Sequence, residues 1–247
     1  MERELKRLRK RFEEIKEGGL YKSVCNGSVG IGQTFERLLG KKADTLFEPD
    51  YNGIEIKTKL GYTKAPLNLF SLIPKCDYGH PLELLVSKFG YPESSFSLFK
   101  VLRAEACSQN RVLTAKKYYF ELKVHRDSKK IRLVVTDKMK NILNEDLYWN
   151  FDLLEERLVN KLSYMALVIT YPYYRNRETY FKYFKMTLYK LRGFEKFLEL
   201  IEQGIIKVVF NIDICKDENN YGRIRDHGTS FKIDNEDIYK LFQKLNI

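Results

Sequence analysis

Hydrophobic and polar positions along this chain follow two different periods, which indicates that helices and strands are mixed throughout it. Residues 2–16 carry apolar side chains at helical spacing among charged ones, and Gly18 and Gly19 follow as a stop. Apolar and polar residues alternate over Tyr118–His125 and again over Ile131–Thr136, as they do in half-buried strands. The polar residues between these two runs predict a hairpin.

The same patterns predict the remaining elements. Helices are expected over Thr34–Leu39, residues 80–90, Phe151–Leu162, Gly193–Gln203 and Asn235–Leu245. Strands are expected over Ile54–Thr58, Leu67–Ile73, Tyr164–Tyr171, Ile205–Ile214 and Thr229–Ile233, with Pro172 ending the third of them. Residues 173–190 combine aromatic and basic side chains, and their secondary structure stays open. The mixture predicts an α/β or α+β fold with a central mixed β-sheet flanked by helices.

Length and composition limit the domain number, the localisation and the kinds of cysteine site that the protein can have. The 247 residues suit one large domain or two small lobes. The chain has no run of about 18 apolar residues, and its N-terminus lacks the apolar stretch of a signal peptide, so we expect a cytoplasmic protein with no membrane contact. The four cysteines form no C-x-x-C pair, which argues against a zinc ribbon or a redox dithiol.

The charge is strongly positive. The net value is +11, from 44 Lys and Arg against 33 Asp and Glu. A field of that sign attracts polyanions, of which nucleic acid is the commonest in the cytoplasm. A lysine-rich solvated surface explains the same excess, so charge alone leaves a nucleic-acid partner open.

The segment LFEPDYNGIEIKTKL carries the most information about chemistry. Asn52-Gly53 is a strong hairpin signal, and the next residues alternate as a strand does. Residues two apart in a strand share a face, so Glu55 and Lys57 point to one side while the isoleucines beside Glu55 point into the core. The turn doubles the chain back and brings the Asp50 carboxylate toward Glu55.

Two converging carboxylates make a hard oxygen site of the kind that Mg²⁺ prefers, and Mn²⁺ can substitute for it. A divalent ion held there can activate water and stabilise negative charge during phosphodiester hydrolysis. Lys57 can orient the attacking water or share the charge on the phosphate. Glu36, on the preceding helix, can complete the metal site or support its ligands.

The Glu-x-Lys pattern is common in itself. The chain also contains it at Glu4/Lys6, Glu14/Lys16 and Glu121/Lys123. A solvent-facing strand pair is therefore the alternative for Glu55 and Lys57. Two features favour a metal site: Pro-Asp precedes the pair at hairpin distance, and the flanking residues are apolar on the core side only.

Three segments together resemble the MvaI/BcnI family of type II restriction endonucleases, relatives of the repair nicking enzyme MutH. GGLYKSVCNGSVGIGQTFERLLG is similar to the Gly-rich lead into that family's first catalytic helix, FEPDYNGIEIKT to its metal-site hairpin, and RDHGTSFKI to its DNA-reading loop and strand. YWNFD, between them, is also similar, so the resemblance runs from about residue 18 to residue 233.

The resemblance implies a PD-(D/E)xK nuclease core. Asp50 and Glu55 would bind Mg²⁺, Lys57 would be the catalytic lysine, and Glu36 an auxiliary acid. The implied activity is metal-dependent hydrolysis of double-stranded DNA at a short, nearly palindromic site of the CCNGG type.

The resemblance also implies an architecture and a way of working. A monomer would grip DNA in a cleft between a mainly catalytic lobe, residues 1–150, and a mainly recognition lobe, residues 151–247, and these lobes can interleave. Such an enzyme would nick one strand before the other. A cognate DNA methyltransferase is expected in the same system.

The third segment supplies candidate DNA-binding residues. They are Arg225, Asp226, His227, Thr229 and Lys232, and Asn211 on the strand before the loop is a further candidate. Arg, Lys and His can donate to guanine O6 and N7, and Asp can accept from cytosine N4. The alternative is that Asp226 and His227 only close a turn before Gly228. The relatives carry a histidine in place of Arg225 and an arginine in place of Asn211, so the target sequence stays open.

Two rival functions remain. One is a strand-specific nicking endonuclease of DNA repair, like MutH, and the other is a non-catalytic DNA-binding module that has kept the fold. Residues 171–190 interleave aromatic and basic side chains, a pattern that can stack bases or follow phosphates. Core aromatics with a solvated basic face explain that pattern as well.

Overall fold

The computed structural model describes residues 1–25, 27, 29–41, 49–93, 98–109, 112–115 and 117–247. The chain forms two compact units, each assembled from separate stretches of sequence. Unit 1 comprises Met1–Ala65, Arg157–Gly193 and Tyr239–Ile247, and unit 2 comprises Pro66–Glu156 and Phe194–Ile238. The chain therefore passes between the units several times, and the assignment of a catalytic and a recognition lobe stays a prediction.

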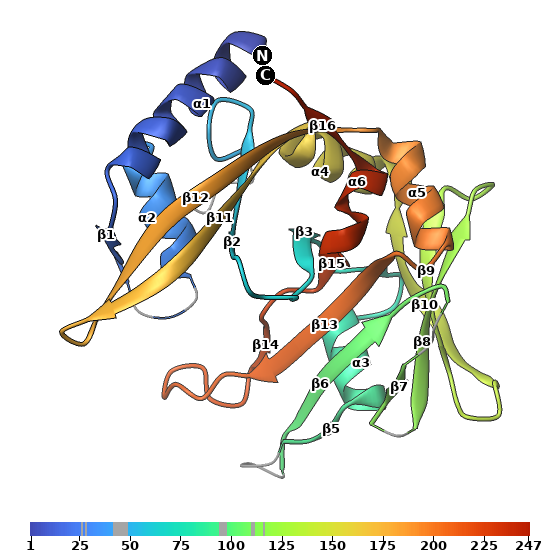
Figure 1. Ribbon diagram of the computed structural model, residues 1–247. Coiled ribbons are helices and arrows are strands. Elements are labelled where there is room, and N and C mark those ends of the chain that lie inside the picture. Colours follow the sequence, from blue (N-terminus) through green and yellow to red (C-terminus); the bar gives the residue numbers. More distant parts are fainter. Residues whose placement is uncertain (26, 28, 42–48, 94–97, 110–111, 116) are drawn as a thin grey trace. The chain divides into compact units, whose positions relative to one another are not determined.

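Unit 1 is built on a mixed sheet. Its elements are α1 (Glu2–Glu17), β1 (Tyr21–Lys22), α2 (Gly30–Leu38), β2 (Glu55–Leu60), β11 (Tyr164–Arg175), β12 (Glu178–Leu191) and β16 (Phe242–Leu245). Two helices, α4 (Phe151–Leu162) and α6 (Ile238–Leu241), begin in unit 2 and end in unit 1. The strand order is β1-β12-β11-β2, with β16 also paired to β12, and β2 runs parallel to β11 (Figure 1).

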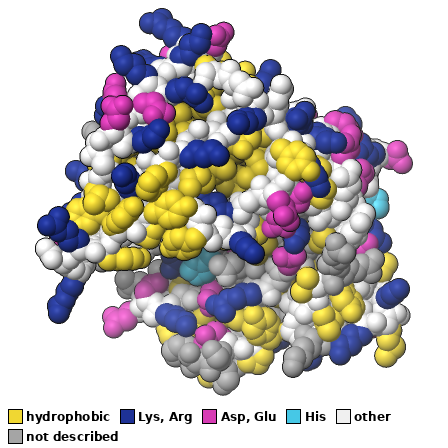
Figure 2. Space-filling view, viewed as in Figure 1, with side chains coloured by type: hydrophobic (Ala, Val, Ile, Leu, Met, Phe, Trp, Pro, Cys, Tyr) yellow, Lys and Arg dark blue, Asp and Glu magenta, His cyan; other side chains and the backbone are white. Residues whose placement is uncertain are grey.

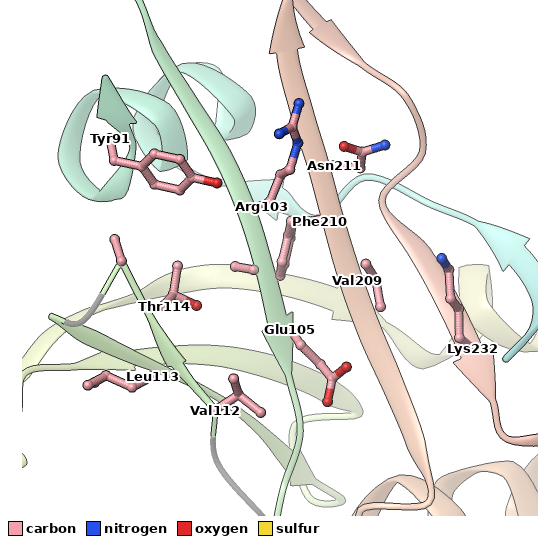
Figure 3. Close-up of a pocket in the computed structure, with 12 residues that line it drawn as sticks. Tyr91, Arg103, Glu105, Val112, Leu113, Thr114, Val209, Phe210, Asn211 and Lys232 are labelled. Carbon is pink, nitrogen blue, oxygen red and sulfur yellow. The ribbon is translucent and has the colours of Figure 1, made fainter. Parts of the chain in front are cut away.

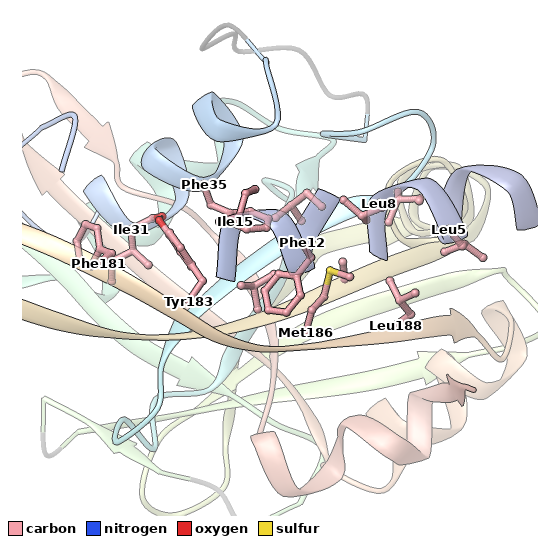
Figure 4. Packing of buried hydrophobic residues seen from close by; sticks show 14 residues of the cluster. Leu5, Leu8, Phe12, Ile15, Ile31, Phe35, Phe181, Tyr183, Met186 and Leu188 are labelled. Atoms are coloured by element: carbon pink, nitrogen blue, oxygen red, sulfur yellow. The ribbon is translucent and has the colours of Figure 1, made fainter. Parts of the chain in front are cut away.

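Helices α1 and α2 cover one face of this sheet and enclose the core of unit 1 (Figure 4). The buried positions of α1 are Leu5, Leu8, Phe12 and Ile15, which recur every three or four residues and so form one stripe. They pack with Phe35 of α2 and with Tyr183 of β12. Each such fully buried side chain contributes roughly 1.5–3 kcal/mol, so this stripe fixes the helix on the sheet.

Unit 2 is built on a larger mixed sheet. Its strands are β3 (Leu67–Ser71), β4 (Lys75–Cys76), β5 (Tyr91–Pro92), β6 (Lys100–Ala106), β7 (Leu113–Thr114), β8 (Tyr118–His125), β9 (Lys130–Thr136), β10 (Ile142–Asn150), β13 (Ile206–Ile214), β14 (Ile224–Asp226) and β15 (Ser230–Ile233). Its helices are α3 (Pro81–Phe89), α5 (Phe194–Glu202) and the 3₁₀ turn η1 (Asn235–Asp237). The main strand order is β3-β15-β13-β6-β8-β9-β10-β4, and buried aromatic rings, including Trp149 and Phe210, fill its core.

Most of the predicted elements are present. The hairpin of β8 and β9, the helix Phe151–Leu162 and the strand β13 lie where the patterns placed them. Strands β6 and β10 were not predicted. None of the described helices combines the length and the hydropathy that crossing a membrane requires.

Two predictions about element ends were wrong. Pro172 lies inside β11 and does not end it. Proline is tolerated there because, in the described residues, the pairing of β11 with β2 stops at Thr170↔Leu60, so the missing N–H breaks no ladder on that side. The predicted helix Asn235–Leu245 ends at Leu241, and the following residues pair with β12 as strand β16. This strand-edge pairing outweighs the helical pattern of a short terminal segment.

Candidate active site

The candidate site lies at a tight hairpin turn before β2. Tyr51 and Ile54 exchange two backbone hydrogen bonds, of 3.0 and 2.8 Å. Asn52 and Gly53, between them, both have positive φ, at 43° and 84°. This combination is typical of a type I′ turn, which Asn-Gly favours because both residues reach that region at low cost. The predicted turn is confirmed, and it delivers the chain directly into β2.

The side chains of β2 alternate between two faces as predicted, and Glu55 is more buried than the pattern indicated. Ile54 and Ile56 are buried in the core of unit 1, on the side of α1 and α2. Glu55 is also buried, with 2% of its surface exposed, whereas the pattern indicated only a half-buried strand. The Lys57 Nζ lies 2.8 Å from Glu55 Oε1, on the same face of the strand. The acid and the amine therefore meet in a largely desolvated place.

Asp50 is held against the start of β2. Its Oδ2 accepts the backbone N–H of Ile56 at 3.0 Å, and its Oδ1 accepts a hydrogen bond from Lys41 Nζ at 3.0 Å. Burial raises the pKa of the Glu55 carboxyl, and the Asp50 charge adds to that rise. The turn thus places the Asp50 charge within electrostatic reach of Glu55, and a metal site shared by the two carboxylates stays a prediction. Each Asp50 oxygen keeps a second acceptor position for a further ligand.

The surroundings of the Glu55 carboxylate are those that a bound cation would stabilise. Burial raises its pKa, while Lys57 and, more weakly, Lys161 lower it without cancelling the effect. Lys161 Nζ, from the last turn of α4, lies 3.4 Å from Glu55 Oε1. Among the described residues, no hydrogen-bond partner reaches the buried Glu55 Oε2. An unpartnered buried carboxylate oxygen is costly, and a bound cation would satisfy it.

The donor set fits a Mg²⁺-type ion with two protein carboxylates. No group of three His, Cys, Asp or Glu side chains with metal-binding geometry occurs among the described residues. Mg²⁺ is usually held by one or two carboxylates plus waters and substrate phosphates, so Asp50 and Glu55 suffice. Glu36 lies on α2 and does not join them in this conformation. Its expected auxiliary role stays a prediction.

The residues predicted to read DNA lie together in unit 2. Arg225 of β14 pairs with Asp213 of β13, and the His227 N–H donates to the Asn211 carbonyl at 2.9 Å. Lys232 lies on β15, opposite Lys207 of β13. The structure therefore gathers these side chains around strand β13.

Asp226 and Thr229 have structural roles in this loop. Asp226 accepts the N–H groups of Gly228 at 2.9 Å and Thr229 at 3.0 Å, which is the arrangement of the turn-closing alternative. Thr229 is fully buried. The contact expected between the Thr229 side chain and DNA does not fit this burial, because no part of that side chain reaches the surface.

Two lysines beside the carboxylates have no counterpart in the sequence prediction. Lys41 contacts Asp50, and Lys161 contacts Glu55. Lys161 is far from Glu55 along the chain and reaches it only because β11, which follows α4, pairs in parallel with β2. The helical pattern of α4 carries no signal for that contact.

Aromatic side chains also gather on the surface of the β11–β12 hairpin. Tyr171, Tyr173, Tyr174 and Phe184 are all exposed, and Figure 2 shows hydrophobic side chains along this hairpin with Lys and Arg at its tip. Residues 171–190 thus present part of their mixed aromatic and basic pattern to solvent, the property that stacking on nucleic acid requires.

Comparisons with known proteins identify the family of the chain. The family model "MvaI/BcnI restriction endonuclease family" matches residues 9–242. The structure of restriction endonuclease MvaI in complex with its cognate DNA substrate is similar at 28% identity and a TM-score of 0.88, over 98% of this chain and 97% of that one. MvaI in the absence of DNA is similar at 28% identity and a TM-score of 0.64, over 99% and 98%. No curated protein matches the chain. The chain therefore belongs to the MvaI/BcnI restriction endonuclease family, whose members are type II site-specific deoxyribonucleases.

Proposed function

We propose that this protein hydrolyses phosphodiester bonds of double-stranded DNA at Asp50, Glu55 and Lys57, with Mg²⁺ as the cofactor and Mn²⁺ as a substitute. The observation that carries the proposal is the buried Glu55 carboxylate, which has Lys57 on one oxygen and no described hydrogen-bond partner on the other. A purely structural strand pair has no reason to leave a carboxylate oxygen buried in this way.

The roles of the three residues follow from their contacts. Glu55, through Oε2, and Asp50, through its remaining acceptor positions, would hold the cation. When bound, such an ion supplies positive charge against the negative charge that develops on a phosphate. Lys57 is fixed by Glu55 at 2.8 Å, so its ammonium can donate to the attacking water or to a phosphate oxygen without further ordering.

Double-stranded DNA is the substrate that the rest of the chain favours. The net charge of +11 suits a polyanion, and the similar MvaI structure contains its cognate DNA. Arg225, His227, Lys232 and Asn211 supply hydrogen-bonding groups around β13. We assign them to base or backbone contacts, and we leave Thr229 out because it is buried.

Finer features of the activity belong to the same proposal. The enzyme acts as a monomer, nicks one strand before the other, and recognises a short near-palindromic site of the CCNGG type. A cognate DNA methyltransferase protects the host sites. Unit 1, which contains the three active-site residues, is the catalytic lobe, and unit 2 is the recognition lobe.

The test is a time course on supercoiled plasmid and on linear DNA of known sequence with Mg²⁺, followed by mapping of the ends. Glu55→Gln and Lys57→Ala are compared with Glu121→Gln and Lys123→Ala. The second pair has the same Glu-x-Lys spacing, on strand β8, but Lys123 is exposed and Glu121 only half-buried. The controls therefore change the same residue types at the same spacing outside the site.

Defined ends from wild type and both controls, with none from the two site variants, would support the proposal. A transient open circle that becomes linear indicates sequential cutting, and a lasting open circle indicates a nicking enzyme like MutH. Absence of metal-dependent cleavage across varied DNA would leave only a DNA-binding module. Wild-type cleavage by Glu55→Gln or Lys57→Ala would place the chemistry elsewhere.

A further inference from the structure

One face of the unit 2 sheet carries several half-buried polar and charged side chains. Along β13 the residues alternate strictly: Ile206, Val208, Phe210, Ile212 and Ile214 are buried, whereas Lys207, Val209, Asn211 and Asp213 are half-buried on the other face. The second set forms a row that the hydrophobic core does not use. Groups on this face are accessible to a ligand.

The neighbouring strand β6 adds two charged residues to this face. Arg103 lies opposite Asn211, and Glu105 lies opposite Val209, so paired side chains stand side by side. Together with Lys232 of β15 they line a hollow of about 540 Å³. Figure 3 shows Arg103, Asn211 and Lys232 around it, with Glu105 between the strands. Neither Arg103 nor Glu105 was singled out in the sequence.

Arg103 is both exposed and fixed in position. Its side chain is 59% exposed, and its Nη2 donates to Asp213 Oδ2 at 3.0 Å. Asp213 is itself anchored, because its Oδ1 accepts the N–H of Ile214 at 2.9 Å. A carboxylate thus holds one edge of the guanidinium, and solvent reaches its other donors. Fixing the side chain in advance lowers the entropy cost of binding.

The mixture of groups suits the edge of a base pair better than a phosphate. A surface that follows phosphates needs positive charge alone, whereas here Glu105 and Asp213 lie among the donors. Arginine presents five N–H donors in a fixed fork, and two of them match O6 and N7 of guanine in the major groove. Because Asp213 binds one edge of the Arg103 guanidinium, such a pair of donors remains available on the rest of it.

We propose that Arg103 is a specificity-determining residue that reads guanine in the major groove, with Asp213 as the positioning residue that aims its guanidinium. This inference rests on the proposed function in requiring double-stranded DNA as the ligand, but not in requiring its cleavage. Arg103 would fix one G·C position of the target.

The experiment selects DNA by binding. The full-length protein is incubated with duplexes that carry a randomised central segment, in Ca²⁺ in place of Mg²⁺, and bound duplexes are sequenced. Wild type is compared with Arg103→Lys, which keeps the charge and loses the fork, and with Asp213→Asn. The matched control is Arg126→Lys, because Arg126 is also an arginine of unit 2 held by carboxylates, those of Glu195 and Glu202, but it lies outside the hollow. Thermal unfolding checks that all variants fold.

Arg103→Lys should lose about ten- to hundredfold discrimination at one G·C pair, with other positions unchanged. Asp213→Asn should weaken discrimination at that same pair by a smaller factor, and Arg126→Lys should match wild type. The proposal is overturned if wild type enriches no sequence, if Arg103→Lys discriminates as wild type does, or if it weakens all duplexes equally, as a phosphate contact would. Unchanged discrimination in Asp213→Asn would remove the positioning role. Enrichment by a wild type that cuts nothing in Mg²⁺ would refute the nuclease proposal alone.

Discussion

Replacing Glu55 by glutamine is expected to stop DNA cleavage and yet leave the metal-free protein at least as stable as wild type. The carboxylate is almost fully buried, and burial raises its pKa, so its charge disfavours the folded state when no cation is bound. In the variant, the ammonium groups of Lys57 and Lys161 no longer face a carboxylate, but they are 18% and 24% exposed and so still reach water. Burial affects the pKa of Glu55 more than the two lysines do. Removing the charge should therefore raise the unfolding free energy by about 0–2 kcal/mol.

The assay is thermal unfolding with and without Mg²⁺, next to a cleavage assay. At a Mg²⁺ concentration about 100 times Kd, wild type should gain about 2.7 kcal/mol, or roughly 5–10 °C in Tm for a chain of this size. Glu55→Gln should show no such shift, and its cleavage rate should fall at least about a thousandfold. The control Glu121→Gln should keep both properties. A wild-type metal shift in Glu55→Gln, or a destabilisation of more than about 3 kcal/mol without metal, would refute this reasoning.

Three further substitutions test separate contacts. Lys161→Met removes one of the two ammonium groups on Glu55 Oε1 and should slow single-turnover cleavage about tenfold. Lys161→Arg should keep most of the rate. An unchanged rate in Lys161→Met would show that the contact has no role in cleavage. Asp226→Ala leaves two loop N–H groups without their acceptor and should lower the unfolding free energy by about 1–3 kcal/mol in urea, so wild-type stability would contradict the turn-closing role. Phe242→Ala empties a fully buried position on β16 and should cost about 3–5 kcal/mol in the same assay; a loss below about 1 kcal/mol would show that β16 does not anchor the C-terminus.

Local signals explain which parts of the site the sequence predicted. The Asn52-Gly53 turn depends on the φ preferences of two adjacent residues, and the alternation around Glu55 depends on the period of a strand. Both are properties of a short segment, so the turn and the shared face of Glu55 and Lys57 were predictable. The resemblance to a known family added the identity of the chemistry.

Long-range pairing explains what the sequence did not reveal. Glu55 is buried and contacted by Lys161 because β2 pairs with β11 and α4 precedes β11, none of which is encoded near Glu55. Arg103 faces Asn211 only because β6, which was not predicted, pairs with β13. The strand β16 likewise depends on an open edge of β12. Each is decided by which strands become neighbours.

The most direct test of the central claim is a crystal structure of the protein with Mn²⁺ and a duplex that contains its target, with the ion located by anomalous scattering. The proposal predicts Mn²⁺ coordinated by Glu55 Oε2 and by the Asp50 carboxylate, with Lys57 Nζ directed at the scissile phosphate or the water beside it. An ion bound elsewhere, with Glu55 Oε2 still buried and uncoordinated, would contradict it.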